Sequence, residues 1–456
     1  MIYVDVNIWD VIVTMFGIII VLFISRHIQK KNINKYPEYR YYSRGIFFKL
    51  ILGLFLCLIY VYYYTYGDTI DYWRGSLDLS ELLTSKPKVY FSIHFGNISF
   101  ENYCQFKHYH EWYYMYRDPN SYAIIRFNSL LAPFSFNSYF VMTILLASLS
   151  YIGIWKLFRL FYNEFSEIGK YLAFAFLFVP SVAFWGSGIM KDTYTFSATC
   201  WLVYSFYKVF IHKEKILPNV IAIIVMSYIL LSTRPFMLYI CIVSIILMLT
   251  HYYLISVKGG FIKAISLVVI VVVFWGGGIL LLTYLSKTAG GAYSTIDTML
   301  EKAVITQQDL SREYYGKNSF DIGAFEPSLP GILSKAPVAI NAGLYYPYIW
   351  KTRNAVMLIS GLENLFLLLL SLYVLVLIIV AIFKIGPRYM LKTLFNHPLV
   401  IFSLSYAIPF AFMVGLTTAN YGALVRYKIP LIPFFLSSLF IIINRFNKQR
   451  EKHITK

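Results

Sequence analysis

Four cationic residues stand in short polar segments between long apolar runs of this sequence: Lys191, Arg234, Arg353 and Arg426. In membrane proteins positive charge is concentrated in cytoplasmic loops, whereas these four segments fall on the opposite side in the topology that the apolar runs define. Arginine suits a phosphate because its planar guanidinium forms two parallel hydrogen bonds at fixed geometry. We therefore expect the four side chains to gather around a lipid-linked phosphate or diphosphate.

The segment that carries Lys191 is a polar turn, Phe184 to Thr193, with the sequence FWGSGIMKDT. Its two glycines would let backbone amides approach an anion, and we expect Trp185 and Asp192 to support that site. The alternative is local. Lys191 and Asp192 could form an ion pair that caps the following helix, because a carboxylate near a helix N-terminus is favourable.

The other cations also have structural explanations. Arg234 precedes a proline, which suits the first turn of a following helix, so it could mark an ordinary helix boundary. Arg426 and the nearby Lys428 could extend along apolar surface and keep their charges in water at a membrane interface. Asn420 lies in the same polar segment and is expected to support Arg426. Several cations on one predicted side of the membrane favour a shared anion site over separate explanations.

Three carboxylates are candidates for a proton acceptor: Asp68, Asp71 and Glu363. A carboxylate beside a sugar hydroxyl can take its proton as the hydroxyl attacks an anomeric carbon. Asp68 and Asp71 begin a polar segment, where they could equally form the solvated first turn of a helix. Glu363 lies inside an apolar run, where a charge costs about 2.5–3.5 kcal/mol, so it needs an ion-pair partner or a chemical task.

Histidines and cysteines give no metal-binding pattern. His94, His108 and His110 could act as bases or ligands, but a His-x-His pair is more typical of an exposed loop. Three of the four cysteines fall in apolar runs and the fourth stands alone in a polar stretch, so no disulfide or metal spacing is present. We expect no metal and no other cofactor.

The composition is that of an integral membrane protein. The chain has 456 residues, of which 59% are hydrophobic and 14% charged, with a mean hydropathy of +0.62. Repeated apolar runs of about 17–25 residues predict an all-α, polytopic transmembrane bundle rather than a barrel of alternating strands. The net charge of +18 lies mainly in loops and tails beside these runs, as topology signals do, so we expect no nucleic-acid partner.

We predict about eleven spans, each roughly the length that a bilayer requires. Their approximate bounds are 11–25, 46–66, 138–158, 171–184, 193–211, 219–232, 236–254, 264–285, 354–383, 399–416 and 429–443. A dense basic cluster follows the first span, so by the positive-inside rule the N-terminus faces outward and the C-terminus is cytoplasmic. Residues 1–456 then form one membrane domain with two long external segments, 67–137 and 286–353.

Several short motifs occur in a characteristic order along the chain. They are Gly67–Tyr72 (GDTIDY), Pro180–Asp192 (PSVAFWGSGIMKD), Arg234–Phe236 (RPF), Tyr348–Asn354 (YIWKTRN) with Glu363-Asn364, and Asn420–Tyr427 (NYGALVRY). In this order the chain resembles the Wzy-type and EpsG-type bacterial polysaccharide polymerases and their GT-C glycosyltransferase relatives, over about residues 68–430.

The resemblance implies a GT-C-like bundle in the bacterial cytoplasmic membrane, with an active site that faces outward. The activity would polymerise undecaprenyl-diphosphate-linked oligosaccharide repeat units into capsule, exopolysaccharide or O-antigen, without a nucleotide. Lys191, Arg234, Arg353 and Arg426 would bind the leaving diphosphate, on which charge develops in the transition state. Its partners would be the polyprenyl-linked oligosaccharide, the lipid bilayer, and a chain-length regulator and a flippase as accessory proteins.

Two alternatives stay open. A GT-C transferase would add single sugars from a polyprenyl phosphate, with Asp68 or Asp71 in the first external segment as the base. A non-enzymatic flippase would move the lipid-linked oligosaccharide without forming bonds. Transporters commonly show internal repeats, and this sequence has none that we can detect, which favours an enzyme.

Overall fold

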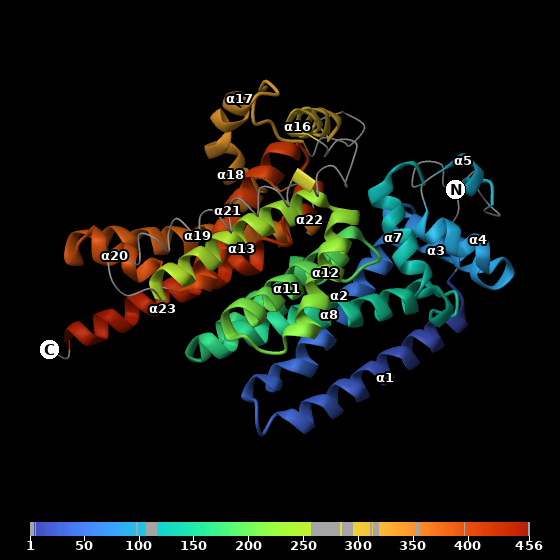
Figure 1. The fold of residues 1–456 in the computed structure, drawn as a ribbon, viewed down its shortest axis with the longest axis horizontal. Coiled ribbons are helices and arrows are strands. Elements are labelled where there is room, and N and C mark those ends of the chain that lie inside the picture. The colour runs from blue at the N-terminus through green and yellow to red at the C-terminus, as the bar shows by residue number, and fades with distance from the viewer. Residues whose placement is uncertain are drawn as a thin grey trace. The chain divides into compact units, whose positions relative to one another are not determined.

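The computed structural model describes residues 4, 6–96, 99–105, 116–256, 283–284, 295–310, 312, 319–352, 355–395 and 397–454. Nearly all of these residues are helical (Figure 1), and an isolated β-bridge joins Ser319 to Asn420. The described part of the chain is therefore all-α, as predicted. Its apolar helices identify a membrane protein.

Seven of the described helices are long and apolar enough to cross a membrane. They are Ile8–Asn32, Pro37–Tyr64, Tyr139–Glu164, Ile216–Thr233, Pro235–Ile255, Met357–Lys384 and Pro398–Thr417. An eighth span is possible if the pair Tyr421–Tyr427 and Ile432–Lys448, bent by 65°, crosses as one broken helix. These elements fall on eight of the predicted spans.

The remaining predicted spans differ from a plain apolar helix. Residues 171–184 are divided into α9 (Gly169–Ala173), the π-helix η6 (Phe174–Phe178) and α10 (Pro180–Trp185). The break falls at Pro180, because proline lacks the amide hydrogen and its ring clashes with the preceding turn. Residues 193–211 form α11 (Lys191–Phe206) and the π-helix η7 (Tyr207–His212), which carry three charged side chains near their ends. The span predicted at 264–285 lies outside the described residues except for 283–284, so the total of about eleven stays a prediction.

The contacts divide the chain into two compact units. The first unit comprises residues 1–159, 176–202 and 224–234, and the second comprises 160–175, 203–223 and 235–456.

In the first unit, helices from the membrane and from the predicted external segment share one core. Its helices are α1 (Ile8–Asn32), α2 (Tyr42–Leu58), α3 (Asp68–Ser85), α4 (Pro87–Phe95), α5 (Phe100–Tyr103), α7 (Pro119–Ser129), α10, and parts of α8 (Tyr139–Glu164), α11 and α12 (Ile216–Thr233). Helix α2 packs on α1 and α10, and α3 packs on α4 and α7. Buried aromatic and aliphatic residues of α3, α4 and α7 continue into Leu56, Met142 and Met190. The helices of the predicted external segment are therefore fixed to the helix ends that carry the polar turn.

Two local signals define where the external helices begin. Helix α7 starts at Pro119, preceded by Asp118, whose carboxylate accepts hydrogen bonds from the amides of Asn120 and Ser121. Such an N-cap and a proline in the first turn are both favourable. Helix α3 follows Gly67, whose φ of 144° suits only glycine, and carries Asp68 and Asp71 in its first turn.

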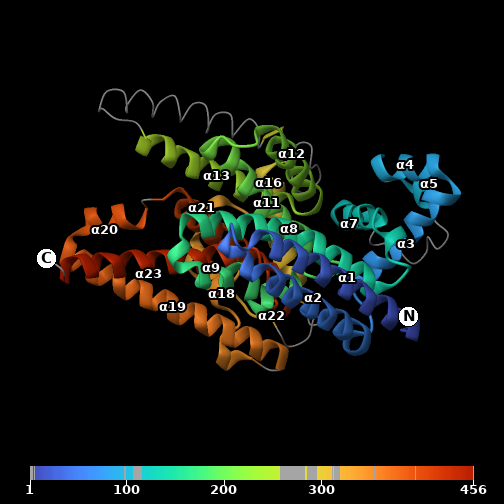
Figure 2. The same ribbon diagram turned by 90° about the horizontal axis from the view of Figure 1, so that it is seen from below.

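The second unit contains α9, the other parts of α8, α11 and α12, and the helices that follow Arg234. They are α13 (Pro235–Ser256), α16 (Ile296–Leu310), α17 (Leu329–Ser334), α18 (Ala336–Tyr345), α19 (Ala355–Ile385), α20 (Pro387–Leu394), α21 (Pro398–Thr417), α22 (Tyr421–Tyr427) and α23 (Ile432–Ile454). The long helices α19 and α23 lie side by side in this unit (Figure 2). Helix α21 packs against α13, α18 and α23 and forms the centre of the unit.

Helix α18 lies within the segment that we expect to be external, yet it packs closely along α21. A Cβ on Gly343 would lie 2.0 Å from the carbonyl oxygen of Ala411, and one on Gly415 would lie 1.9 Å from that of Ala339. These two contacts run in opposite chain directions, so α18 lies antiparallel to the last turns of α21. The segment 286–353 therefore includes a helix that follows an apolar helix back along its length.

Candidate functional site

The centre of the candidate site is an ion pair between Lys191 and Asp118. Lys191 is the first residue of α11, and its Nζ lies 3.1 Å from Oδ2 of Asp118, the N-cap of α7. The hydroxyl of Ser121 also donates to this carboxylate, at 2.5 Å. The side chains of Lys191 and Asp118 are 17% and 32% exposed. This ion pair is therefore partly exposed and links the polar turn to the predicted external segment.

The surroundings shift the titration of both groups. Burial by itself would raise the pKa of Asp118, but the charge of Lys191 and the hydrogen bond from Ser121 outweigh it, so the pKa lies below its usual value. Burial lowers the pKa of Lys191, and the attraction of Asp118 opposes that effect.

A second ion pair lies behind the first. Nη2 of Arg234, at the end of α12, lies 2.7 Å from Oδ1 of Asp192. The Arg234 side chain is 9% exposed and that of Asp192 is fully buried. The alternative of a local Lys191–Asp192 pair therefore does not describe the structure, because each residue pairs with a partner distant in sequence. Asp192 instead ties the start of α11 to the end of α12.

The candidate base Asp68 belongs to the same group of charges. Lys191 is attracted by Asp68 and repelled by Arg234, so the three side chains lie within electrostatic range. We call Asp68, Asp118, Lys191, Asp192 and Arg234 the Lys191 cluster. Asp71 lies in the same first turn of α3 as Asp68 and is half-buried. Two cations and three carboxylates meet here, so an incoming anion would have to displace Asp118 from Lys191.

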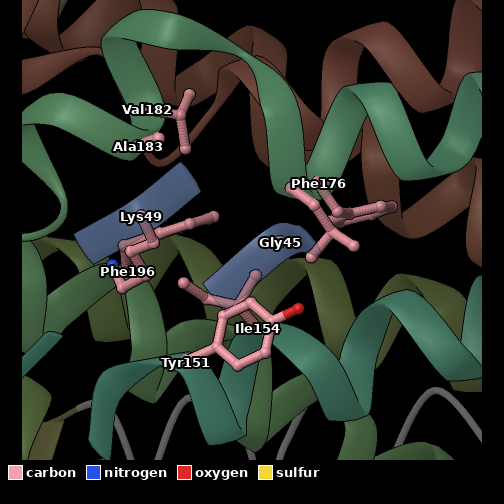
Figure 3. Close-up of a pocket in the computed structure, with 9 residues that line it drawn as sticks. Gly45, Lys49, Tyr151, Ile154, Phe176, Val182, Ala183 and Phe196 are labelled. Atoms are coloured by element: carbon pink, nitrogen blue, oxygen red, sulfur yellow. The ribbon is translucent and has the colours of Figure 1, made fainter. Parts of the chain in front are cut away.

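The turn between α10 and α11 is closely supported. Trp185 is half-buried, and its ring contacts Phe184 edge-to-face at 5.0 Å between centroids. Beneath the turn, Nζ of Lys49 donates a hydrogen bond to the carbonyl oxygen of Gly186. Figure 3 shows Lys49 on α2 beside Val182 and Ala183 of α10, at a small cavity of about 10 Å³.

Sequence reasoning missed both Lys49 and Asp118. Lys49 escaped notice because we expected its span to begin at residue 46, near which a lysine is unremarkable, whereas the apolar helix runs from Pro37 to Tyr64. A lysine in the middle of a span is the signal that was available. Asp118 carried only the weaker signal of an Asp-Pro helix start in a long polar segment.

The other predicted site residues belong to the second unit or lie outside the described residues. Glu363 is half-buried on α19 and interacts electrostatically with Lys428. The Lys428 side chain is buried and donates to the carbonyl oxygens of Leu344, at 3.3 Å, and Tyr346, at 2.9 Å. It also donates to Oδ1 of Asn364. Lys428 therefore secures the end of α18 rather than extending to an interface.

Asn420 and Arg426 lie on the segment that contains α22. Asn420 is buried and caps α22 by accepting from the amides of Gly422, at 2.9 Å, and Ala423, at 3.3 Å. Arg426 is half-buried, and its guanidinium lies 5.8 Å from the ring centroid of Tyr427. Arg353 lies outside the described residues. The structure thus brings Lys191, Arg234 and Asp68 into one cluster, and describes Arg426, Glu363 and Asn420 in the other unit.

One of the three candidate histidines, His94, lies among the described residues. His94 is buried at the end of α4, where burial and the charge of Arg126 lower its pKa, so the neutral form is favoured. His108 and His110 lie outside the described residues. Among the described side chains, no group of three or more His, Cys, Asp or Glu residues is placed to hold a metal ion.

A larger cavity lies on the predicted external segment. Its volume is about 510 Å³, and it is lined by Trp73, Leu77, Asp78, Ser80, Glu81, Thr84, Ala132, Pro133 and Asn137. Carboxylates, hydroxyls and an amide beside an indole ring provide hydrogen-bond partners and a flat apolar face. Sugars have the complementary combination of hydroxyls and apolar ring faces.

No family model, curated protein or solved structure matches this chain. The functional argument therefore depends on the residues and contacts of the chain itself.

Proposed function

We propose that the chain is a membrane glycosyltransferase that polymerises undecaprenyl-diphosphate-linked oligosaccharide repeat units into a surface polysaccharide. The reaction would take place at the outer face of a bacterial cytoplasmic membrane. In this proposal Lys191 contacts the diphosphate of the lipid-linked donor. The resemblance in motif order to polysaccharide polymerases is the source of the substrate class.

The observation that supports this function most strongly is the partly exposed Lys191–Asp118 pair beside Arg234 and Asp68. A cation that is buried enough to be selective, yet paired with a carboxylate that can be displaced, is suited to an anionic ligand. The second ion pair is buried and serves to fix the start of α11. Lys191 would therefore be the cation that contacts substrate, and Arg234 the one that adds positive potential behind it.

The chemistry would be a displacement at the anomeric carbon of the donor. The acceptor hydroxyl forms the new carbon–oxygen bond as the bond to the diphosphate breaks, and the diphosphate leaves with the electron pair. The hydroxyl proton passes to a carboxylate, for which Asp68 is the candidate that lies within range of Lys191. Lys191 stabilises the charge that develops on the leaving group. No nucleotide takes part.

The cavity at Trp73 supports a glycan as the acceptor. Asp78 and Glu81 make it acidic, which disfavours a second phosphate but suits sugar hydroxyls as hydrogen-bond donors. It lies on α3, the helix whose first turn carries Asp68. An acceptor repeat unit held there would be kept close to the helix that presents the base.

The single-sugar transferase is the second candidate, and one observation favours it. Asp68 follows directly on the end of the span Pro37–Tyr64 and lies within electrostatic range of Lys191. This is the position that the GT-C resemblance implies for a base in the first external segment. A monophosphate donor would also require fewer cations than a diphosphate.

Reconstitution distinguishes these functions. Purified protein in liposomes would receive an undecaprenyl-diphosphate-linked repeat unit, and the products would be sized by electrophoresis. We expect a ladder of lengths. A single added sugar, seen only with a polyprenyl-phosphate donor, would establish the transferase instead. Movement of the lipid across the bilayer without new bonds would establish a flippase. Either of these two results would overturn the proposal of a polymerase.

A further inference from the structure

We propose that Lys49 is a positioning residue for Lys191: it holds the turn between α10 and α11 from beneath. The inference rests on the proposed function only in the claim that Lys191 contacts substrate. Its structural part concerns Gly186–Met190, the five residues that connect the two helices. Lys191 follows this turn directly, so the path of the turn sets where its side chain begins.

A charged side chain is energetically unfavourable at the position of Lys49. It lies in the middle of the apolar helix Pro37–Tyr64 and is 3% exposed. A lysine at the centre of a span is energetically unfavourable unless its charge has hydrogen-bond partners or a function. The hydrogen bond that its ammonium donates goes to a backbone carbonyl, that of Gly186.

The acceptor lies at the end of a helix. Gly186 is the C-cap of α10, and the last carbonyls of a helix have no intrahelical partner. A positive charge at this end is favourable, both as a hydrogen-bond donor and toward the partial negative charge of the carbonyls. Figure 3 shows that Val182, Ala183 and Phe196 surround Lys49, and such an apolar environment strengthens the bond.

The same face of α2 supports the rest of the turn. Lys49, Gly53 and Leu56 are spaced by four and three residues, so they lie on one side of the helix. A Cβ on Gly53 would lie 3.0 Å from Cβ of Ser187, and one on Gly188 would lie 2.7 Å from Cδ2 of Leu56. The turn therefore packs directly against α2, and a side chain larger than that of glycine would not fit at position 53 or 188 without a shift of its neighbours.

Hydrogen bonds within the turn complete the support. The hydroxyl of Ser187 donates to the carbonyl oxygen of Ala183, and the hydroxyl of Thr193 donates to that of Gly188 at 2.6 Å. The amide of Met190 also donates to Gly188, at 2.9 Å. Each of these bonds lies within residues 183–193, whereas the bond from Lys49 joins the turn to α2; among the described residues it is the hydrogen bond from the turn to a helix other than α10 and α11. Its loss would free the turn to move relative to Asp118.

Hydrogen exchange and kinetics on three proteins test this inference: wild type, Lys49→Met and Lys49→Arg. We expect Lys49→Met to speed amide exchange in peptides covering 184–193 by about tenfold, because local opening becomes easier, with exchange in α8 unchanged. Lys49→Arg, which keeps a cationic donor, should stay within about threefold of wild type. Product formation in Lys49→Met should fall through both a higher KM and a lower kcat, because a displaced Lys191 contacts the diphosphate less well in the bound donor and in the transition state.

The outcomes separate the two proposals. Unchanged exchange at 184–193 in Lys49→Met would overturn the positioning role, whatever the activity. A different result would be faster exchange at 184–193 in Lys49→Met together with a wild-type protein that makes no polymer. This result would support the role of Lys49 in the turn and overturn the proposed function. If Lys49→Met does not fold, Lys49→Gln takes its place, because the glutamine amide is a neutral hydrogen-bond donor. Its amide exchange at 184–193 should be faster than that of wild type but slower than that expected when the bond to Gly186 is lost. Amide exchange at 184–193 equal to that of wild type in Lys49→Gln would contradict the inference. Exchange in Lys49→Arg as fast as in Lys49→Met would contradict it as well.

Discussion

At the scale of single residues, the Lys191 cluster combines an accessible ion pair with a buried one. Lys191 and Asp118 are partly exposed, whereas Asp192 is fully buried against Arg234. A partly exposed pair can exchange partners at a lower energetic cost than a buried one, because water can solvate its charges when they separate. The buried pair cannot, because separating it leaves a charge without compensation. The two pairs therefore have different roles, the first toward a ligand and the second in holding helices together.

The titration of Asp118 gives a prediction for stability. Asn can still cap α7, so Asp118→Asn removes the ion pair and keeps the cap. The pKa of Asp118 is depressed in the folded protein, so its stabilisation is present above the unfolded value, about 3.9, and is lost as the pH falls through the folded value. Thermal unfolding in detergent should show wild type more stable than the variant by roughly 0.5 kcal/mol at pH 7, and this difference should shrink as the pH falls below about 3.9. A difference that grows toward low pH would contradict the ion pair.

At the scale of elements, the site is made by helix ends rather than by whole helices. The starts of α3, α7 and α11 and the end of α12 each supply one or two of its charged groups. Helix ends expose amides or carbonyls, and the local caps decide where they fall. The shared core beneath α3 and α7 then fixes these ends against α2 and α8. Precision at the site therefore comes from packing of the predicted external segment.

The Arg234–Asp192 pair should be critical to this arrangement. Asp192→Asn or Arg234→Met leaves one buried group without its counter-charge, and we expect each to lose about 3–5 kcal/mol of stability. The double variant, Asp192→Asn with Arg234→Met, leaves no buried charge and should lose clearly less than the sum of the two. Unfolding of the three proteins in a double-mutant cycle measures the coupling. Additive losses would show that the two side chains act independently.

The contact of α18 with α21 gives a second prediction at this scale. Gly343→Ala and Gly415→Ala each place a Cβ about 2 Å from a carbonyl oxygen, so the two helices would have to separate. Overpacking of this kind costs about 1–3 kcal/mol, and we expect the melting temperature to fall accordingly. Gly17→Ala on α1 is the matched control, because a Cβ there meets nothing within 4 Å. Equal melting temperatures for Gly343→Ala and Gly17→Ala would exclude close packing of α18.

At the scale of the whole molecule, the sequence predicts much of the fold and less of the site. Seven of the predicted spans coincide with described helices that are long and apolar enough to cross a membrane, because lipid requires such helices whatever their packing. Charge asymmetry singled out Lys191 and Arg234. Their partners were beyond reach: Asp118 is 73 residues from Lys191, and only the folded external segment brings them together. The antiparallel contact of α18 was equally hidden, since a short helix with small residues gives no topology signal.

The predicted topology can be tested with a native cysteine. Cys104 is exposed on the segment expected outside, whereas Cys57, Cys200 and Cys241 are buried. A membrane-impermeant maleimide should label intact cells of wild type but not of Cys104→Ser. Lys213→Cys in the Cys104→Ser background, at a turn expected inside, should react only after permeabilisation. The opposite labelling pattern would show that the chain has the inverted orientation in the membrane, which would exclude a site that faces outward.

Binding of the lipid-linked diphosphate is the most direct test of the central claim, that Lys191 contacts this group. Affinity for an undecaprenyl-diphosphate-linked repeat unit would be measured with wild type, Lys191→Met and Lys88→Met in detergent. Lys88 is an exposed lysine on α4 and controls for the loss of one charge. We predict that Lys191→Met binds at least about tenfold more weakly, as loss of a charge-assisted contact requires, and that Lys88→Met matches wild type. Equal affinity for all three folded proteins would contradict the account.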